Sequence, residues 1–297
     1  MISVVIPHYK DFENLSNTLK SINEQKEVFD EIIIVDDFSN DSSVDKIKNS
    51  FKDVKIITFH KHKGIAFVRN KCIKESKCDI ILFVDSDIML QKNCVNKLVS
   101  EIKNFDIVFP KIIFENKRVM HPLLLEEKIY PQITACFMIK RSAIKNNNLF
   151  FDETYSYCYE DADFFLRANL KNLKMKYIKS AVAVHKLKVR KNSEKRFYLE
   201  NRNLLYGIKK FKKLKTDIYH PFHFSSLFKN FVCALFNYDK FDWSHYDRSS
   251  SFWQKFKLLF KKHRKITEKN RLILIYLFFK AVWWNIFYRT RTSMFYS

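Results

Sequence analysis

The first half of the chain alternates short apolar runs with amphipathic stretches, and this alternation limits the fold more than any other feature. Apolar runs rich in Ile and Val predict buried parallel strands, here at Ile2–Pro7, Glu31–Asp36, Val54–Phe59 and Asp79–Val84. Apolar residues at helical spacing predict helices at Asn14–Gln25, Ile65–Ser76 and Cys94–Lys103. The alternation therefore predicts an α/β fold, with a Rossmann-like, mostly parallel sheet and helices on both faces.

The next part of the chain continues this pattern less regularly. Further strands are predicted at Ile107–Phe114, Ala135–Ile139 and Lys176–Val184, and a helix is predicted from Glu160 to about Asn172. The segment Glu115–Gln132 has weak periodicity and two prolines. We expect it to be a surface loop near the active site.

Length and composition point to a catalytic domain with an appendage. The 297 residues are 47% hydrophobic, enough for one large domain or for a domain plus a helical extension. From about Ser193 the sequence becomes basic, aromatic and helical, beginning with the amphipathic stretch Glu194–Lys213. We expect a catalytic domain over residues 1–210 and a basic helical extension over residues 211–297.

The six cysteines and the start of the chain bear on the compartment. No two cysteines form a C-x-x-C pair, so we expect reduced core thiols, as in a cytosolic protein. Met1 runs directly into a strand-like segment without a basic region before it, so no signal peptide is expected.

The tripeptide Asp85-Ser86-Asp87 carries the clearest chemical signal. It follows an apolar run, and ligands of open α/β sheets bind at the carboxyl ends of strands. In an extended chain Asp85 and Asp87 point the same way, and two such carboxylates repel unless a cation lies near them. Hard divalent ions prefer these oxygens and complete their shell with phosphates and water. A solvated turn at the end of the strand is the ordinary alternative.

Further polar residues follow other predicted strands and loops. Asp36-Asp37 ends the second strand and can accept hydrogen bonds from a base or ribose, or can cap the next helix, as can Ser39. Gly64 is one of only two glycines, which indicates a special backbone angle or a close ligand approach. Arg69 on the following helix can reach a phosphate or can be an ordinary exposed arginine.

Acidic residues also begin the helix predicted near residue 160. In Glu160-Asp161-Ala162-Asp163 the carboxylates are favoured by the helix dipole, which is the plain explanation. Sugar transfer, however, needs a group that deprotonates the acceptor hydroxyl, and a carboxylate here can do so. His185 ends a predicted strand and is either structural or a metal ligand.

Taken in order, these residues resemble the family 2 glycosyltransferases, which are inverting enzymes with the A-type fold of nucleotide-sugar transferases (GT-A). The resemblance covers roughly residues 1–210. Its matching segments are Val4-Val5-Ile6-Pro7-His8-Tyr9, Ile34-Val35-Asp36-Asp37-Phe38-Ser39, Gly64 through Arg69-Asn70, Asp85-Ser86-Asp87, Glu160-Asp161-Ala162-Asp163 and Val184-His185.

The resemblance implies a nucleotide-sugar donor and places its contacts. Pro7 and Tyr9 would border the base, Asp37 would contact uracil or ribose, and Gly64 and Arg69 would lie near the base and diphosphate. A UDP-sugar is favoured by how common it is in the family, although His8 and Lys10 depart from the usual residues there.

The resemblance also implies the chemistry. Asp85 would touch the ribose or sugar, and Asp87 with His185 would hold a divalent metal ion, Mn²⁺ or Mg²⁺. Asp161 would be the catalytic base, with Glu160 beside it at the acceptor. The reaction would be a single in-line displacement with inversion at the anomeric carbon.

The C-terminal region adds a prediction about location. The formal charge of the chain is +22, which favours anionic partners. The stretch Leu272–Tyr288 is too short to span a bilayer comfortably and contains Lys280, so an interfacial helix fits better. An aromatic face is shared by Phe252, Trp253, Phe256, Leu259 and Phe260.

We expect a peripheral enzyme on the cytoplasmic face of a bacterial membrane that acts on a lipid-linked or lipopolysaccharide glycan. A helical subdomain packed on the catalytic domain is the alternative.

Other function classes fit less well. A nucleic-acid-binding protein would also be basic, but no RNA-binding motif is present, and we expect no nucleic acid partner. A sugar nucleotidyltransferase would need a glycine-rich loop after the first strand, and residues 7–12 contain no glycine. A degenerate transferase domain on a basic binding protein is a further alternative. The sugar, the acceptor linkage and the oligomeric state are not encoded in any motif.

Overall fold

The structure is a computed structural model that describes residues 1–25, 29–120, 123–125, 128–130, 134–186, 194–212 and 268–287. The chain divides into two compact units, Met1–Val189 and Arg190–Ser297. The predicted boundary at residue 210 differs from this division, because the helix that ends at Lys210 belongs to the second unit.

A nine-stranded sheet forms the centre of the first unit, with the strand order β3-β2-β1-β4-β10-β6-β11-β5 and β7 paired to β6. The first four strands of this order run parallel. They are β1 (Ile2–His8), β2 (Glu31–Asp36), β3 (Lys55–Thr58) and β4 (Ile80–Val84). Their apolar runs are buried because helices cover both faces, as the sequence predicts.

The rest of the sheet is mixed. Strand β10 (Cys136–Lys140) lies antiparallel between β4 and β6 (Ile107–Phe114). Strand β11 (Met175–His185) runs parallel to β6, and β5 (Ile88–Leu90) pairs antiparallel with β11. The predicted α/β class with flanking helices is confirmed, while the mostly parallel description holds for the half that contains the first four strands.

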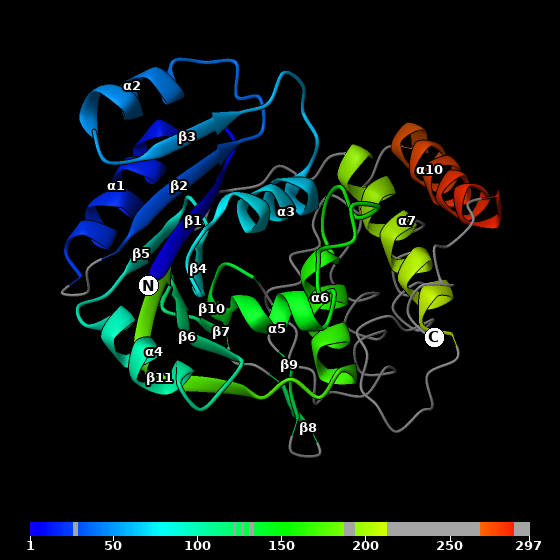
Figure 1. Ribbon diagram of the computed structural model, residues 1–297. Coiled ribbons are helices and arrows are strands. Elements are labelled where there is room, and N and C mark those ends of the chain that lie inside the picture. Colours follow the sequence, from blue (N-terminus) through cyan, green and yellow to red (C-terminus); the bar gives the residue numbers. More distant parts are fainter. Residues whose placement is uncertain are drawn as a thin grey trace. The chain divides into compact units, whose positions relative to one another are not determined.

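The helices of the first unit form two layers, one on each face of the sheet (Figure 1). A hydrophobic core lies between the sheet and each layer. Alternate residues of β1 point to opposite faces, so Val4 packs in one core and Val5 in the other. The first layer contains α1 (Phe12–Asn23), α2 (Ser43–Ser50) and α4 (Cys94–Ile102). The second contains α3 (Ile65–Glu75), α5 (Arg141–Asn146) and α6 (Glu160–Leu170).

The structure corrects several local predictions. The predicted loop Glu115–Gln132 contains three short strands, β7 (Val119–Met120), β8 (Leu123–Leu125) and β9 (Lys128–Tyr130). β7 extends the main sheet and β8 pairs with β9. These strands, β5 and the short helices α2 and α5 were missed because each is too brief to show a periodicity.

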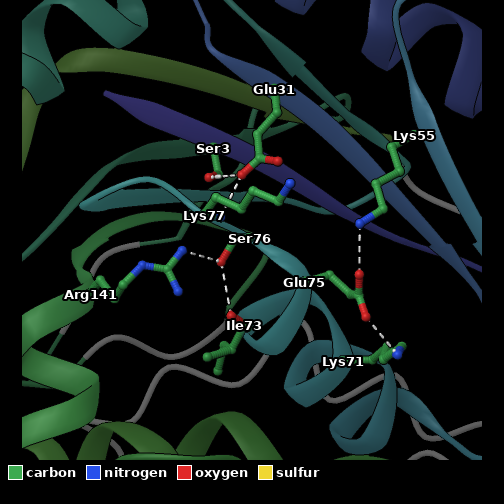
Figure 2. A network of polar contacts seen from close by, with 9 residues as sticks. All are labelled: Ser3, Glu31, Lys55, Lys71, Ile73, Glu75, Ser76, Lys77 and Arg141. Carbon is green, nitrogen blue, oxygen red and sulfur yellow. Dashed lines mark hydrogen bonds and ion pairs between the residues drawn. The ribbon is translucent and has the colours of Figure 1, made fainter.

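The amino ends of the parallel strands are held by polar contacts around the end of α3 (Figure 2). Glu31 accepts hydrogen bonds from the Ser3 hydroxyl and the Lys77 backbone N–H. Glu75 pairs with Lys55 on β3 and with Lys71 one turn earlier on α3. These contacts fix α3 against the sheet, and α3 carries Arg69 to the opposite, carboxyl edge.

The second unit contains two described helices, α7 (Glu194–Lys210) and α10 (Glu268–Phe287), which pack together. The Asn285 side chain donates to the Arg202 carbonyl at 2.9 Å, and Lys209 donates to the Asn285 carbonyl at 3.0 Å. None of the helices described is long and apolar enough to cross a membrane. The predicted aromatic face at 252–260 lies outside the described residues.

The cysteines within the described ranges are free thiols, and four of them are buried: Cys72, Cys78, Cys94 and Cys136. Cys158 is partly exposed, and Cys233 lies outside the described residues.

Candidate active site

The predicted site residues gather along one edge of the sheet. Because β1, β2 and β4 are parallel and in register, Tyr9, Asp37 and Asp85 follow their carboxyl ends on the same side. This edge is opposite the network of Figure 2 and is where open α/β sheets bind ligands. The sheet therefore brings together residues that are separated by up to 76 positions.

Arg69 joins two of the predicted carboxylates. Its Nη2 donates to both carboxylate oxygens of Asp85 at 3.0 and 3.1 Å, and its Nη1 donates to Glu160 at 2.8 Å. The Arg69 side chain is only 4% exposed, so the alternative of an ordinary exposed arginine is wrong. Although burial opposes it, the attraction of Asp85 and Glu160 raises the pKa of Arg69 and keeps it charged. Arg69 thus ties the end of β4 to the start of α6.

Asp85 and Asp87 form the acidic strand end that the sequence predicts. The Asp85 N–H donates to the Ala135 carbonyl at 2.8 Å, which anchors the turn to the start of β10. Burial raises the pKa of Asp85, Arg69 opposes the rise, and the nearby Asp87 carboxylate adds to it. The repulsion between the two acids is the property that a bound cation would relieve.

His185 faces Asp87, with its Nε2 3.8 Å from a carboxylate oxygen. Its Nδ1 lies 2.9 Å from the Lys186 carbonyl. A carbonyl can only accept, so Nδ1 carries the proton and a neutral ring leaves the Nε2 lone pair on the Asp87 side. Within the described ranges no group of three or more His, Cys, Asp or Glu side chains could hold a metal ion. Among the described residues, Asp87 and His185 therefore supply two ligands, and further oxygens would complete the coordination of an ion.

Asp161 lies at the start of α6, next to Glu160. The two residues before the helix, Cys158 and Tyr159, both have left-handed backbone angles, with φ of 50° and 66°. Non-glycine residues adopt such angles at a cost, and they cluster where function fixes the backbone. The Asp161 carboxylate accepts the Ala162 N–H at 2.7 Å. Burial raises the pKa of Asp161 to about 7, and the Glu160 carboxylate adds to the rise.

Glu160 itself is only partly satisfied. One carboxylate oxygen accepts from Arg69, whereas the buried second oxygen, Oε2, has no hydrogen-bond partner in the described part of the chain. A buried carboxylate oxygen without a partner is costly, so it is suited to accept a bond from a ligand hydroxyl. Asp163, the last acid of the motif, is instead fully buried and paired with Arg167 at 2.7 Å, which is a structural role.

Asp37 closes a corner at the end of β2. Its carboxylate accepts the backbone N–H groups of Lys63 and Gly64 at 2.6 and 2.9 Å, and the His62 ring lies 2.9 Å away. Tyr9 is 45% exposed and its ring centroid is 4.9 Å from that of His62. Helix α2 begins only at Ser43, so the alternative in which Asp37 or Ser39 caps the next helix is wrong.

Pro7 and Gly64 line the same corner in different ways. Pro7 is buried within β1, where it pairs in register with Val35, two residues before Tyr9. Gly64 has φ of 97°, and a Cβ there would lie 2.6 Å from the Ser156 carbonyl oxygen. The predicted special backbone angle is present, and the close neighbour is the loop that precedes α6.

His62 was missed from the sequence. The run from His60 to Gly64 leads directly into α3, and its histidines next to one of two glycines were the available signal. Nothing in that run indicates which side chain turns toward Asp37, because the turn depends on the Asp37 bonds to the 63–64 backbone.

The fold and the acidic residues at the strand ends are those of a nucleotide-sugar transferase. Comparison with known proteins supports this class. The profile of glycosyl transferase family 2 matches residues 3–161, which is more than half of the chain. The chain therefore belongs to glycosyl transferase family 2.

Similar proteins include the poly(ribitol-phosphate) β-N-acetylglucosaminyltransferase TarP of Staphylococcus aureus (strain N315), 31% identical over 59% of this chain and 60% of that protein. A poly(ribitol-phosphate) β-glucosyltransferase of Bacillus spizizenii is 32% identical over 59% of this chain and 30% of its own length. The chain thus spans less than two thirds of these relatives.

Solved structures show the same fold. Staphylococcus aureus TarS in complex with UDP-GlcNAc superposes with a TM-score of 0.55 at 21% identity, covering 72% of this chain and 68% of that one. GalNAc-T7 with UDP, GalNAc and Mn²⁺ gives a TM-score of 0.57 at 16% identity, covering 70% and 47%. These likenesses confirm the predicted A-type transferase fold.

Proposed function

We propose that this chain is an inverting glycosyltransferase that moves a sugar from a nucleotide-sugar donor, with a UDP-sugar favoured, to a hydroxyl of a bacterial cell-envelope glycan. The observation that carries the proposal is the geometry of the site: Arg69 ties Glu160, which is next to Asp161 at the start of α6, to Asp85 at the end of β4. Burial at this position raises the pKa of Asp161 to about 7. Membership of family 2 supports the activity. This membership disfavours the alternative of a sugar nucleotidyltransferase.

The residues divide the reaction between them. Asp161 accepts the proton of the acceptor hydroxyl as that oxygen attacks the anomeric carbon, and a base with a pKa near the working pH suits this task. The nucleoside diphosphate leaves from the opposite face, which gives inversion. Glu160 Oε2 accepts a hydrogen bond from the acceptor, and Arg69 holds Glu160 and Asp85 in place through its two ion pairs.

The donor would bind along the strand ends. Tyr9, His62 and Asp37 would contact the base and ribose. Pro7 and Gly64 would border the same part of the donor. Asp87 and His185 would hold Mn²⁺ or Mg²⁺ together with diphosphate oxygens, and the ion would neutralise charge on the leaving diphosphate. The Mn²⁺ and UDP named for one similar structure support this assignment.

The acceptor is a hydroxyl of an anionic envelope polymer. The two relatives are named for poly(ribitol-phosphate), and a chain with a formal charge of +22 suits a polyanionic acceptor. A lipopolysaccharide or other lipid-linked glycan, presented to a peripheral enzyme at the cytoplasmic face of the membrane, is the acceptor class implied by the sequence. This second acceptor class is included in the test below.

The test offers the full chain each donor with each acceptor. UDP-GlcNAc and UDP-glucose are incubated with poly(ribitol phosphate), a lipopolysaccharide core or a polyprenyl-diphosphate glycan, with Mn²⁺ present, and products are detected by mass. We expect one sugar added per acceptor hydroxyl in the wild type and none with Asp161→Asn. Absence of transfer with every pair, in protein that binds UDP, would contradict the proposed acceptors. Equal transfer by Asp161→Asn would contradict the assignment of the base.

A further inference from the structure

Helix α10 carries a stripe of large side chains on its surface, here called the α10 stripe: Tyr276, Phe279, Trp283 and Ile286. Each is between 57% and 65% exposed. Their spacing of three, four and three residues places them on one face of the helix. Exposed apolar residues usually occur singly, so four together mark an interaction surface.

The opposite face of α10 is the one that packs on α7. Phe278, Ala281 and Asn285 are buried, and at 100° per residue they lie about 150° around the helix from the stripe. Asn285 fixes this orientation through two hydrogen bonds to α7. Its side chain donates to the Arg202 carbonyl, and its own carbonyl accepts from Lys209. The stripe therefore lies on the face of α10 that points away from α7.

The charge around the stripe selects its partner. Lys280 is exposed on the same helix, with its Nζ 5.9 Å from the Tyr276 ring centroid. Between residues 250 and 291 the sequence has eleven Lys and Arg residues and one acid, Glu268. A second copy would bring these like charges together, whereas an anionic surface would compensate them.

The chemistry of the stripe matches a bilayer surface. Trp and Tyr prefer the membrane–water interface because their rings are apolar with a polar tip. Within the described residues no helix is suited to span a membrane, and α10 has Lys280 and Asn285 in its second half. A helix of this kind lies in the plane of the interface with its apolar face in the headgroup region.

We propose that α10 binds the surface of an anionic lipid bilayer through the α10 stripe, with Lys280 at the headgroups. This inference deepens the proposed function, because such an anchor would hold the enzyme where envelope glycans are assembled. It specifies which helix and which side chains make the contact.

The experiment measures flotation of the full chain with vesicles of phosphatidylcholine alone or with roughly one third phosphatidylglycerol. We expect binding to the anionic vesicles that weakens with salt. Replacing both Phe279 and Trp283 by Ser should weaken vesicle binding at least tenfold. The double variant Phe279→Trp and Trp283→Phe keeps two aromatic side chains and should bind like the wild type. Lys280→Glu should weaken vesicle binding roughly fivefold. The matched charge change Lys20→Glu, at an exposed position of α1 in the other unit, should leave vesicle binding nearly unchanged.

Each outcome separates this inference from the proposed function, because UDP binding is measured on the same preparations. If the wild type binds UDP but ignores anionic vesicles at low salt, the membrane inference is wrong and the transferase proposal stands. If the Ser variant keeps vesicle binding but changes from dimer to monomer in light scattering, the stripe covers a second copy and the inference is also wrong. Vesicle binding without UDP binding would support the anchor and contradict the transferase.

Discussion

Replacing Asp161 by Asn should make the protein more stable at neutral pH while removing its activity. The carboxylate titrates near pH 3.8 in the unfolded chain and at about 7 in the folded protein. Between these values the folded state keeps a proton that the unfolded state has lost, so stability falls as the pH rises through this window. The cost is present in full above pH 7, where the carboxylate is charged.

The magnitude follows from the size of the shift. About three pH units correspond to roughly 4 kcal/mol at 1.36 kcal/mol per unit, and the partial exposure of the side chain reduces this to about 1–3 kcal/mol. Asn carries no charge, so the variant should exceed the wild type by that amount at pH 8 and should approach it near pH 4. Urea denaturation at a series of pH values measures the difference.

Activity should change in the opposite direction. Transfer needs the carboxylate, so the wild-type rate should fall about tenfold per pH unit below pH 7, and the Asn variant should lose roughly a hundredfold or more. Asp163→Asn is the control, because Asp163 is paired with the buried Arg167 and its loss should destabilise by roughly 3 kcal/mol or more. A wild-type rate that is flat from pH 5 to 8 would contradict the role of Asp161 as the base. An Asp161→Asn variant that is no more stable than the wild type at pH 8 would contradict the raised pKa of this carboxylate.

Three further substitutions test the site. Arg69→Met leaves two carboxylates without their buried partner and should cost roughly 3–5 kcal/mol, seen as a lower urea midpoint. Gly64→Ala places a Cβ 2.6 Å from the Ser156 carbonyl at a positive φ and should cost about 1–3 kcal/mol, seen as a melting temperature lowered by several degrees. His62→Ala removes a half-exposed partner of Asp37 and should weaken UDP binding roughly fivefold in calorimetry with little change in melting temperature. A stable Arg69→Met, a neutral Gly64→Ala or unchanged UDP affinity would contradict the respective assignment.

The parallel strands could be predicted from the sequence because a strand that is buried on both faces is a continuous run of apolar residues. The strand Glu31–Asp36 was predicted with its observed bounds, and Asp37 and Asp85 follow strands that the register places side by side. Strand β10 was located, but its antiparallel direction was not, because direction depends on the path of the chain rather than on the residues of the strand.

The site was only partly readable for a related reason. The sequence places Asp85 after a strand and Asp161 at the start of a helix, but not the link between the two segments. That link runs through Arg69, which pairs with Asp85 and with Glu160, and its burial depends on how α3 packs. The contact of Gly64 with Ser156 joins residues that no local pattern relates. The partners of these side chains could therefore not be predicted from the sequence, because they depend on how the elements pack in three dimensions.

Binding of the donor nucleotide at the strand ends can be measured with a thermal-shift panel of UDP, GDP, dTDP and CMP sugars, each with and without Mn²⁺. At about a hundred times its dissociation constant, a ligand adds roughly 2.7 kcal/mol, which is a rise of several degrees for a chain of this size. We expect that rise for a UDP-sugar with Mn²⁺ in the wild type, and we expect it to be lost in Asp87→Ala. No shift with any nucleotide, or an equal shift in Asp87→Ala, would contradict this expectation.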